Sequence, residues 1–181
     1  MARILVVYGT MEGQTRKVAE FAADLARVEG HDVEVIAVEA VTPTHTRYVD
    51  AVLLAASIHV GRHKPAVHAF VRQALPLLSA TPSAFLSVSL SAADERRSGD
   101  ARGYLDAFLA DTEWRPELRE VVGGALRYTE YGMLKRLMMK HIARSHGLSG
   151  DTSRDHELTD WERVRAFTLR FLAGVSASAP V

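Results

Sequence analysis

The sequence predicts an α/β fold in which helices cover both faces of a five-stranded parallel sheet. Short apolar runs alternate with segments of helical periodicity along the whole chain, an order typical of a doubly wound sheet. The chain has 181 residues, of which 48% are hydrophobic, and this size suits one buried core. We therefore expect a single domain over residues 1–181.

Five apolar runs are the predicted strands. Three of them are nearly continuous in apolar character, as expected of strands buried on both faces of a parallel sheet. The second run alternates and contains Asp32 and Glu34, so we expect it at an edge of the sheet. In chain order the runs are 3–8, 32–38, 51–57, 83–90 and 121–126.

Helices are expected between and after these strands, over 15–29, 65–78, 101–111 and 160–173. Gly30 is placed to end the first helix, and Pro65 opens the second as a first-turn proline does. Thr159 and Glu162, in "TDWE", have the spacing of a capping box and predict the start of the last helix.

The composition excludes several classes of site. Basic and acidic residues are equal at 22 each, so no net charge attracts the chain to nucleic acid. The chain has no cysteine, which excludes disulfides and thiol redox centres, so redox work would need a bound cofactor. The first residues lack the pattern of a secretory signal, and the uncharged stretch 74–93 contains Pro76 and Pro82, which favour a turn over a membrane span. We expect a cytoplasmic protein.

The loop after the first strand has the composition of an anion site. Gly9 and Gly13 let the backbone approach a bound group, and Thr10 and Thr15 offer hydroxyls beside the unpaired amides of a helix start. The stretch matches neither a GxxxxGK[ST] loop nor a GxGxxG fingerprint. A turn followed by a helix cap is the competing interpretation of these residues.

The order of three loops decides between these interpretations, because it resembles that of the flavodoxins. "TMEGQT" (10–15) fits their phosphate loop, and "AASIHVG" (55–61) and "SVSLS" (87–91) follow the third and fourth strands, where that family contacts the flavin ring. The resemblance implies a sheet of order 2-1-3-4-5 and FMN as cofactor. The residues it implies for cofactor binding are Thr10, Met11, Glu12, Gly13, Gln14, Thr15, Ser57, Ile58, His59, Val60, Gly61, Ser87, Val88, Ser89, Leu90 and Ser91.

The chain departs from flavodoxins in the two loops near the ring. Neither loop contains an aromatic residue, and His59 and Val60 stand where an aromatic would stack. His59 either lies against the flavin or is a solvated loop histidine. His59, His63 and His68 have no carboxylate at ligand spacing, so we expect no metal site.

An insertion over about 127–158 separates this chain from a minimal flavodoxin. Its segment 128–147 is rich in leucine and methionine on one helical face and basic on the other, with no acidic residue from Met133 to Leu148. Such a helix either lies on an anionic membrane or packs against the domain. The first alternative predicts a peripheral protein on the inner face of the cell membrane.

Motifs dispersed over the chain resemble a narrower family, the flavodoxin-type, menaquinone-dependent protoporphyrinogen oxidases. The matching stretches are "GQTR" (13–16), "ASI" (56–58), "PSAF" (82–85), "WRP" (114–116), "GALRY" (124–128), "MMK" (138–140), "DT" (151–152) and "TDWE" (159–162).

This resemblance implies FMN-dependent oxidation of protoporphyrinogen IX with menaquinone as acceptor, in haem biosynthesis. It singles out no catalytic acid or base. An electron carrier without porphyrinogen activity, and a binding module that has lost flavin, stay open as alternatives. Charge and amphipathicity make these residues candidates for contact with substrate or membrane: Arg127, Tyr128, Tyr131, Lys135, Arg136, Lys140 and Arg144.

Overall fold

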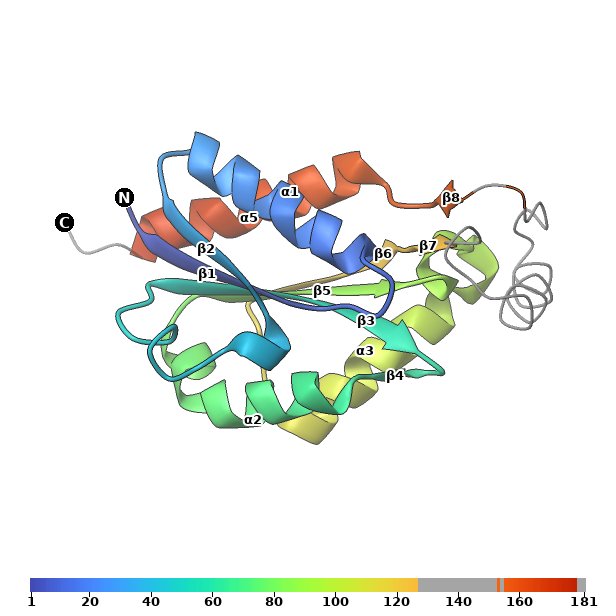
Figure 1. The fold of residues 1–181 in the computed structure, drawn as a ribbon, viewed down its shortest axis with the longest axis horizontal. Coiled ribbons are helices and arrows are strands. Elements are labelled where there is room, and N and C mark those ends of the chain that lie inside the picture. Colours follow the sequence, from blue (N-terminus) through green and yellow to red (C-terminus); the bar gives the residue numbers. More distant parts are fainter. Residues whose placement is uncertain (127–152, 154, 179–181) are drawn as a thin grey trace.

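The structure of the chain is a computed structural model that describes residues 1–126, 153 and 155–178. A twisted sheet runs through its middle, with helices above and below it (Figure 1). The β-strands are β1 (Arg3–Gly9), β2 (Asp32–Ala37), β3 (Ala51–His59), β4 (Arg62–His63), β5 (Ser83–Ser89), β6 (Leu118–Gly123), β7 (Ala125–Leu126) and β8 (His156–Glu157). The α-helices are α1 (Gln14–Val28), α2 (Pro65–Ala80), α3 (Ser98–Thr112) and α5 (Trp161–Ser178), and short 3₁₀ turns cover Val38–Ala40, Ser91–Ala93 and Glu95–Arg97.

The main sheet confirms the predicted strand order. Its five parallel strands are arranged β2-β1-β3-β5-β6, which is the expected order 2-1-3-4-5 once the short β4 is set aside. That strand pairs with the end of β3 in an antiparallel hairpin. The alternating second strand lies at the edge, as predicted.

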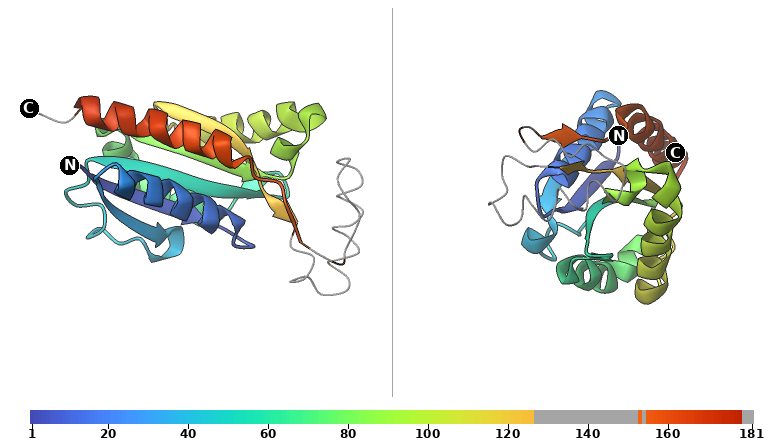
Figure 2. Two further views of the ribbon diagram at one scale, coloured as in Figure 1. Left: turned by 90° about the horizontal axis from the view of Figure 1, so that it is seen from above. Right: turned by 90° about the vertical axis from the view of Figure 1, so that its right-hand side faces the viewer.

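Side chains of alternate strand residues build one core on each face of the sheet. Ile4 and Val6 pack under α1 and α5, whereas Leu5 and Val7 pack against α2 and α3. Figure 2 shows the resulting three layers, with α1 and α5 on one side of the sheet. This double burial explains why the central strands have no polar face in the sequence.

Two local predictions near the end of the sheet are wrong. The run 121–126 is not one strand, because the chain leaves the main sheet at Gly124 and continues as β7, which pairs with β8 in a separate ribbon. Thr159 does not cap α5. Its hydroxyl donates to the carbonyl of Gly123 at 2.8 Å, and Asp160 Oδ1 accepts the Arg163 N–H at 3.0 Å in its place.

The basic segment 128–147 and the candidate contact residues in it lie outside the described residues, and so does Arg127. None of the helices that the structure describes combines the length and the apolar character that crossing a membrane requires.

Two exposed apolar residues have backbone conformations that their side chains disfavour. Val60 (φ 49°) and Gly61 (φ 75°) are the two central residues of the β3–β4 hairpin. Positive φ at both positions is the signature of a type I′ turn, for which Asn-Gly is preferred. Tyr48 (φ 57°), in the loop before β3, is the second case. A non-glycine residue in this region stores about 1–2 kcal/mol of strain.

We expect Val60→Asn and Tyr48→Asn each to raise the free energy of unfolding by about 1 kcal/mol, because asparagine tolerates the left-handed region. Urea unfolding of the purified proteins measures the change.

Val28→Asn is the matched control. Val28 is 82% exposed, close to the 87% of Val60, but it lies in the right-handed backbone of α1. No strain is relieved there, so equal gains for Val28→Asn and Val60→Asn would contradict the prediction.

Candidate functional site

A cavity of about 100 Å³, open to solvent, lies where β1, β3, β5 and β6 end. Ligands of doubly wound sheets bind at this edge, beyond the carboxyl ends of the strands. The cavity brings the three predicted loops together. Its lining residues are Thr10, Met11, Glu12, Gln14, Thr15, Ser57, Ile58, His59, Val88, Ser89, Leu90, Gly124 and Ala125.

Eleven of these thirteen residues were predicted from the sequence, and two were not. Gly124 and Ala125 escaped prediction because the run 121–126 was assigned to one strand. The double glycine at its centre is the signal that the chain turns there, beside the other strand ends. Five predicted residues, Gly13, Val60, Gly61, Ser87 and Ser91, do not line the cavity, and their role in cofactor binding stays a prediction.

The loop between β1 and α1 presents backbone amides at one end of the cavity. Gly13 adopts φ 86°, which glycine allows at little cost. Its own N–H donates to Thr10 Oγ1 at 2.9 Å. The first backbone bond within α1 runs from the Lys17 N–H to the Gly13 carbonyl. The amides of residues 14–16 therefore have no partner within the helix, and they carry the positive end of its dipole.

Gln14 adds an acceptor to this group of donors. Its side chain is buried, and Nε2 donates to Thr159 Oγ1 at 2.9 Å. Because the Thr159 hydroxyl already donates to the Gly123 carbonyl, it can only accept from Gln14, and this fixes the orientation of the amide. Gln14 Oε1 is then a buried acceptor with no partner among the described atoms, which is unusual enough to indicate a missing donor.

No lysine or arginine lines the cavity within the described chain. The two cations of the first turn of α1 are engaged elsewhere, since Arg16 binds Glu20 at 2.8 Å and Lys17 binds Glu157 at 3.1 Å. Burial raises the pKa of Glu157, but hydrogen bonds from Trp161 and Lys17 outweigh it and leave that pKa below its usual value. An anion in the cavity would therefore be held mainly by amides and hydroxyls.

A chain of hydrogen bonds ties the strands together beneath the cavity. Ser57 Oγ donates to the Gly9 carbonyl at 3.3 Å, and the Ser57 carbonyl lies 3.1 Å from His63 Nδ1. The other ring nitrogen of His63 lies 3.4 Å from Ser87 Oγ. One side chain from β4 therefore connects β3 to β5, while Ser57 connects β3 to β1.

This geometry fixes the state of His63. A carbonyl can only accept, so Nδ1 carries a proton, and in the neutral ring Nε2 then accepts from Ser87. The ring is 4% exposed and packs between Phe85 and Phe108, with centroids 5.3 and 4.7 Å away. Burial, together with the nearby His68, lowers the pKa of His63 to about 4 despite its hydrogen bond to the Ser57 carbonyl.

His59, His63 and His68 do not come together as a metal site. His63 is buried under the cavity, His59 lines it, and His68 Nδ1 lies 2.8 Å from Asp111 Oδ2 on the far side of the hairpin. The described residues contain no group of three histidine, aspartate or glutamate side chains suited to a metal.

The rest of the cavity wall is largely apolar. Ile58, Val88, Leu90 and Ala125 contribute to it from the ends of β3, β5 and β7. The cavity thus has a polar end, formed by amides, hydroxyls and the unpaired Gln14 Oε1, next to a mostly apolar end. The arrangement fits a ligand with an anion, hydroxyl donors and a flat apolar ring, which are the three parts of FMN.

Residues 5–153 match the family model described as a flavodoxin domain. The chain is 34% identical to the protoporphyrinogen IX dehydrogenase [quinone] of Escherichia coli K12 over 166 residues, which are 91% of this chain and 92% of that protein. It belongs to this family of flavodoxin-like proteins. A protein of the same name from Leishmania major is 31% identical over 94% of this chain and 75% of its own length. The chain is accordingly a flavin-dependent oxidoreductase.

Solved structures support the fold alone, because their sequences are distant. A flavodoxin from the domain Archaea superposes with a TM-score of 0.57 at 15% identity, covering 96% of this chain and 99% of its own. A Streptococcus pneumoniae TIGR4 flavodoxin gives 0.57 at 16% identity, covering 98% and 100%.

We expect stability to fall with acid through His63. Its pKa is lower in the folded state than the 6.5 of a free histidine, so between these two values the unfolded chain binds more protons and stability rises with pH. The contribution is complete above about pH 6.5 and is lost as the pH falls toward 4. Between pH 7.5 and pH 5 the loss is about 2 kcal/mol.

The measurement compares urea unfolding of the wild type with His63→Gln, which cannot titrate, at both pH values. Other ionisable groups are common to both proteins, so the difference between their pH dependences isolates His63. Parallel stability curves for the two proteins would show that His63 is not a buried neutral ring.

Proposed function

We propose that the chain binds FMN in this cavity and oxidises protoporphyrinogen IX to protoporphyrin IX, with menaquinone as electron acceptor, as a step of haem biosynthesis. The observation that carries the proposal is the cavity itself, which combines an amide-lined anion site with an apolar wall at the strand ends. The relatives' name supplies the substrate and a quinone acceptor.

Each part of the cavity has a role in holding FMN. The amides of residues 14–16 and the hydroxyls of Thr10 and Thr15 would bind the phosphate. Gln14 Oε1, which lacks a donor, would accept a hydrogen bond from the ribityl chain. Ile58, Val88 and Leu90 would border the ring. No basic side chain lines this cavity in the described chain, whereas Glu12 does, so the charge of the lining would not stabilise the electron-rich state of the cofactor.

Bound FMN would supply the redox chemistry, in which the substrate loses three pairs of hydrogens in succession and each pair reduces one quinone to its quinol. The protein orients the reactants and keeps the wall of the site apolar. His63 holds the ends of β3 and β5 at a fixed spacing, and its depressed pKa keeps it neutral at physiological pH. It therefore adds no positive charge beneath the cavity. The ionisable side chains of the lining are Glu12 and His59.

The central experiment is oxidation of protoporphyrinogen under anaerobic conditions, followed by the fluorescence of the porphyrin product. We expect the FMN-loaded protein to oxidise the substrate when a menaquinone analogue is present, and to stop when it is absent. Binding of FMN without porphyrinogen turnover would contradict the proposal and favour an electron carrier.

Two buried threonines test the assignment of the cavity. Thr15 lines it, whereas Thr168 lies in α5, with its hydroxyl bonded to the Val164 carbonyl at 2.8 Å. Each is 1% exposed. Because a hydrogen bond to a charged group contributes about 1.5–3 kcal/mol, we expect Thr15→Val to weaken FMN binding at least about tenfold. Thr168→Val should leave the FMN dissociation constant within about twofold, which flavin fluorescence measures.

We also propose that segment 128–147 holds the protein on the inner face of the cell membrane, where menaquinone resides. The support is its sequence, which combines leucine and methionine with Lys135, Arg136, Lys140 and Arg144. Each basic side chain near an anionic surface contributes about 1 kcal/mol. We expect flotation with anionic liposomes, and its loss when these four residues are changed to alanine.

The control variant removes the same charge elsewhere. Arg102, Arg115, Arg119 and Arg165 are exposed and lie outside the segment, and changing all four to alanine should leave flotation intact. Equal flotation of the two quadruple variants would contradict the membrane proposal and favour the alternative that segment 128–147 packs against the domain.

A further inference from the structure

The β3–β4 hairpin carries a feature that cofactor binding does not explain. Val60, at its tip, is 87% exposed and is held at φ 49°. Asparagine or glycine would relieve the strain, and a polar side chain would avoid the exposed apolar surface. Strain that persists in an exposed turn next to a binding cavity is the pattern seen where a side chain has a functional contact.

Two of the large exposed apolar side chains lie on loops beside this cavity. The large ones among the described residues are Met1, Met11, Val28, Tyr48, Val60 and Leu169. Met11 lines the cavity, and Val60 directly follows Ile58 and His59, which also line it. The loops that carry Met11 and Val60 follow neighbouring strands, since Gly9 of β1 pairs with Ala56 of β3. An apolar ligand at the mouth would cover both side chains.

The hairpin also carries a cation without a partner. Arg62 is exposed, and it forms no ion pair with any residue in the described part of the chain. It stands opposite His59 in the strand register, one residue beyond the turn. Arg62 also lines a second hollow, with Tyr104 and Asp111. The tip thus has an exposed apolar residue and an exposed guanidinium two positions apart, a combination that suits a ring system that carries carboxylates.

The tip is firmly positioned. His63 anchors β4 to the Ser57 carbonyl and to Ser87 Oγ. On the opposite side, a side chain added at Gly61 would lie 3.3 Å from the ring of Tyr104 on α3, so helix and turn are in close contact. These contacts fix the turn beside the cavity, and they leave the Val60 and Arg62 side chains free for a ligand.

We propose that the hairpin tip is a substrate subsite, in which Val60 contacts the apolar macrocycle and Arg62 binds one of its carboxylates. This inference rests on the proposed function, because it takes the substrate to be a carboxylated tetrapyrrole. For Val60 it replaces the cofactor contact that the flavodoxin resemblance implies: the tip determines substrate affinity and leaves FMN affinity unchanged.

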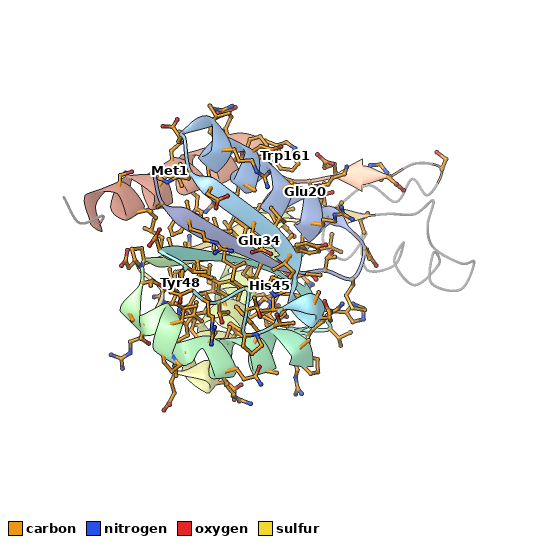
Figure 3. The ribbon with its side chains drawn as sticks, turned by 60° about the vertical axis from the view of Figure 1, so that its left-hand side comes forward. Met1, Glu20, Glu34, His45, Tyr48 and Trp161 are labelled. Carbon is orange, nitrogen blue, oxygen red and sulfur yellow. The ribbon has the colours of Figure 1, made fainter. Side chains whose placement is uncertain are left out.

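The chain contains its own control pair. Arg47 and Tyr48 are also an exposed arginine and a strained exposed apolar residue, with Tyr48 at φ 57° and 85% exposed. They lie in the loop before β3, at the other end of the sheet, where neighbouring Val49 and Asp50 line a hollow with Met1. Figure 3 labels Tyr48 and Met1.

The experiment compares Val60→Asn/Arg62→Gln with Tyr48→Asn/Arg47→Gln in the FMN-loaded full-length protein. Protoporphyrin IX binding is titrated by its absorbance, FMN binding by flavin fluorescence, and thermal unfolding shows that both variants fold. We expect the hairpin variant to weaken porphyrin binding at least about tenfold, as loss of a charge-assisted bond would, with FMN affinity within about twofold. The control variant should change neither affinity.

Four outcomes would overturn the inference. Porphyrin affinity within twofold of wild type would show that the tip makes no substrate contact. A parallel loss of FMN affinity would assign Val60 to the cofactor. If the wild-type protein bound FMN but no porphyrin, both the proposed function and the proposed subsite would be contradicted. A wild type that turns over porphyrinogen alongside an unaffected hairpin variant would contradict the subsite alone.

Discussion

The site depends on the buried hydrogen bonds of His63. This side chain comes from a strand of only two residues, yet it connects the ends of β3 and β5 and sets the position of the β3–β4 hairpin. Its neutral ring suits an apolar setting between two phenylalanines and places no charge below the cavity. Because Ser57 also donates a hydrogen bond to the Gly9 carbonyl, the ends of β1, β3 and β5 are held at a fixed spacing. This spacing positions the loops that follow the three strands.

A second constraint comes from the far end of the sequence. Gln14 and Thr159 are 145 residues apart, and their hydrogen bond joins the first turn of α1 to the segment that enters α5. Glu157 joins the same two parts of the fold by accepting hydrogen bonds from Lys17 of α1 and Trp161 of α5. Trp161 also packs on Phe21 of α1, with ring centroids 5.0 Å apart. The anion end of the cavity is therefore supported by the last part of the fold as well as the first.

The sequence was sufficient for the strand order and for most of the cavity lining, because parallel strands bring the residues that follow them to one edge. It was insufficient where a contact between distant segments overrides a local pattern. "TDWE" has capping-box spacing, but the Thr159 hydroxyl is drawn to Gly123, 36 residues earlier, which leaves the cap to Asp160. The burial of His63 was not predicted, because nothing local in a two-residue strand signals it. The turn at Gly124 was not predicted because this residue lies inside an apolar run.

The β7–β8 ribbon has a consequence for how the chain can vary. Leu126 and His156 are directly paired across it, so the chain departs and returns at one point, beside the cavity that Ala125 helps to line. Topologically, everything between them is the loop of a hairpin. The length and composition of the segment between Leu126 and His156 can then change, in evolution or by design, without altering the register of the main sheet. A different segment could be inserted at this point of the same core.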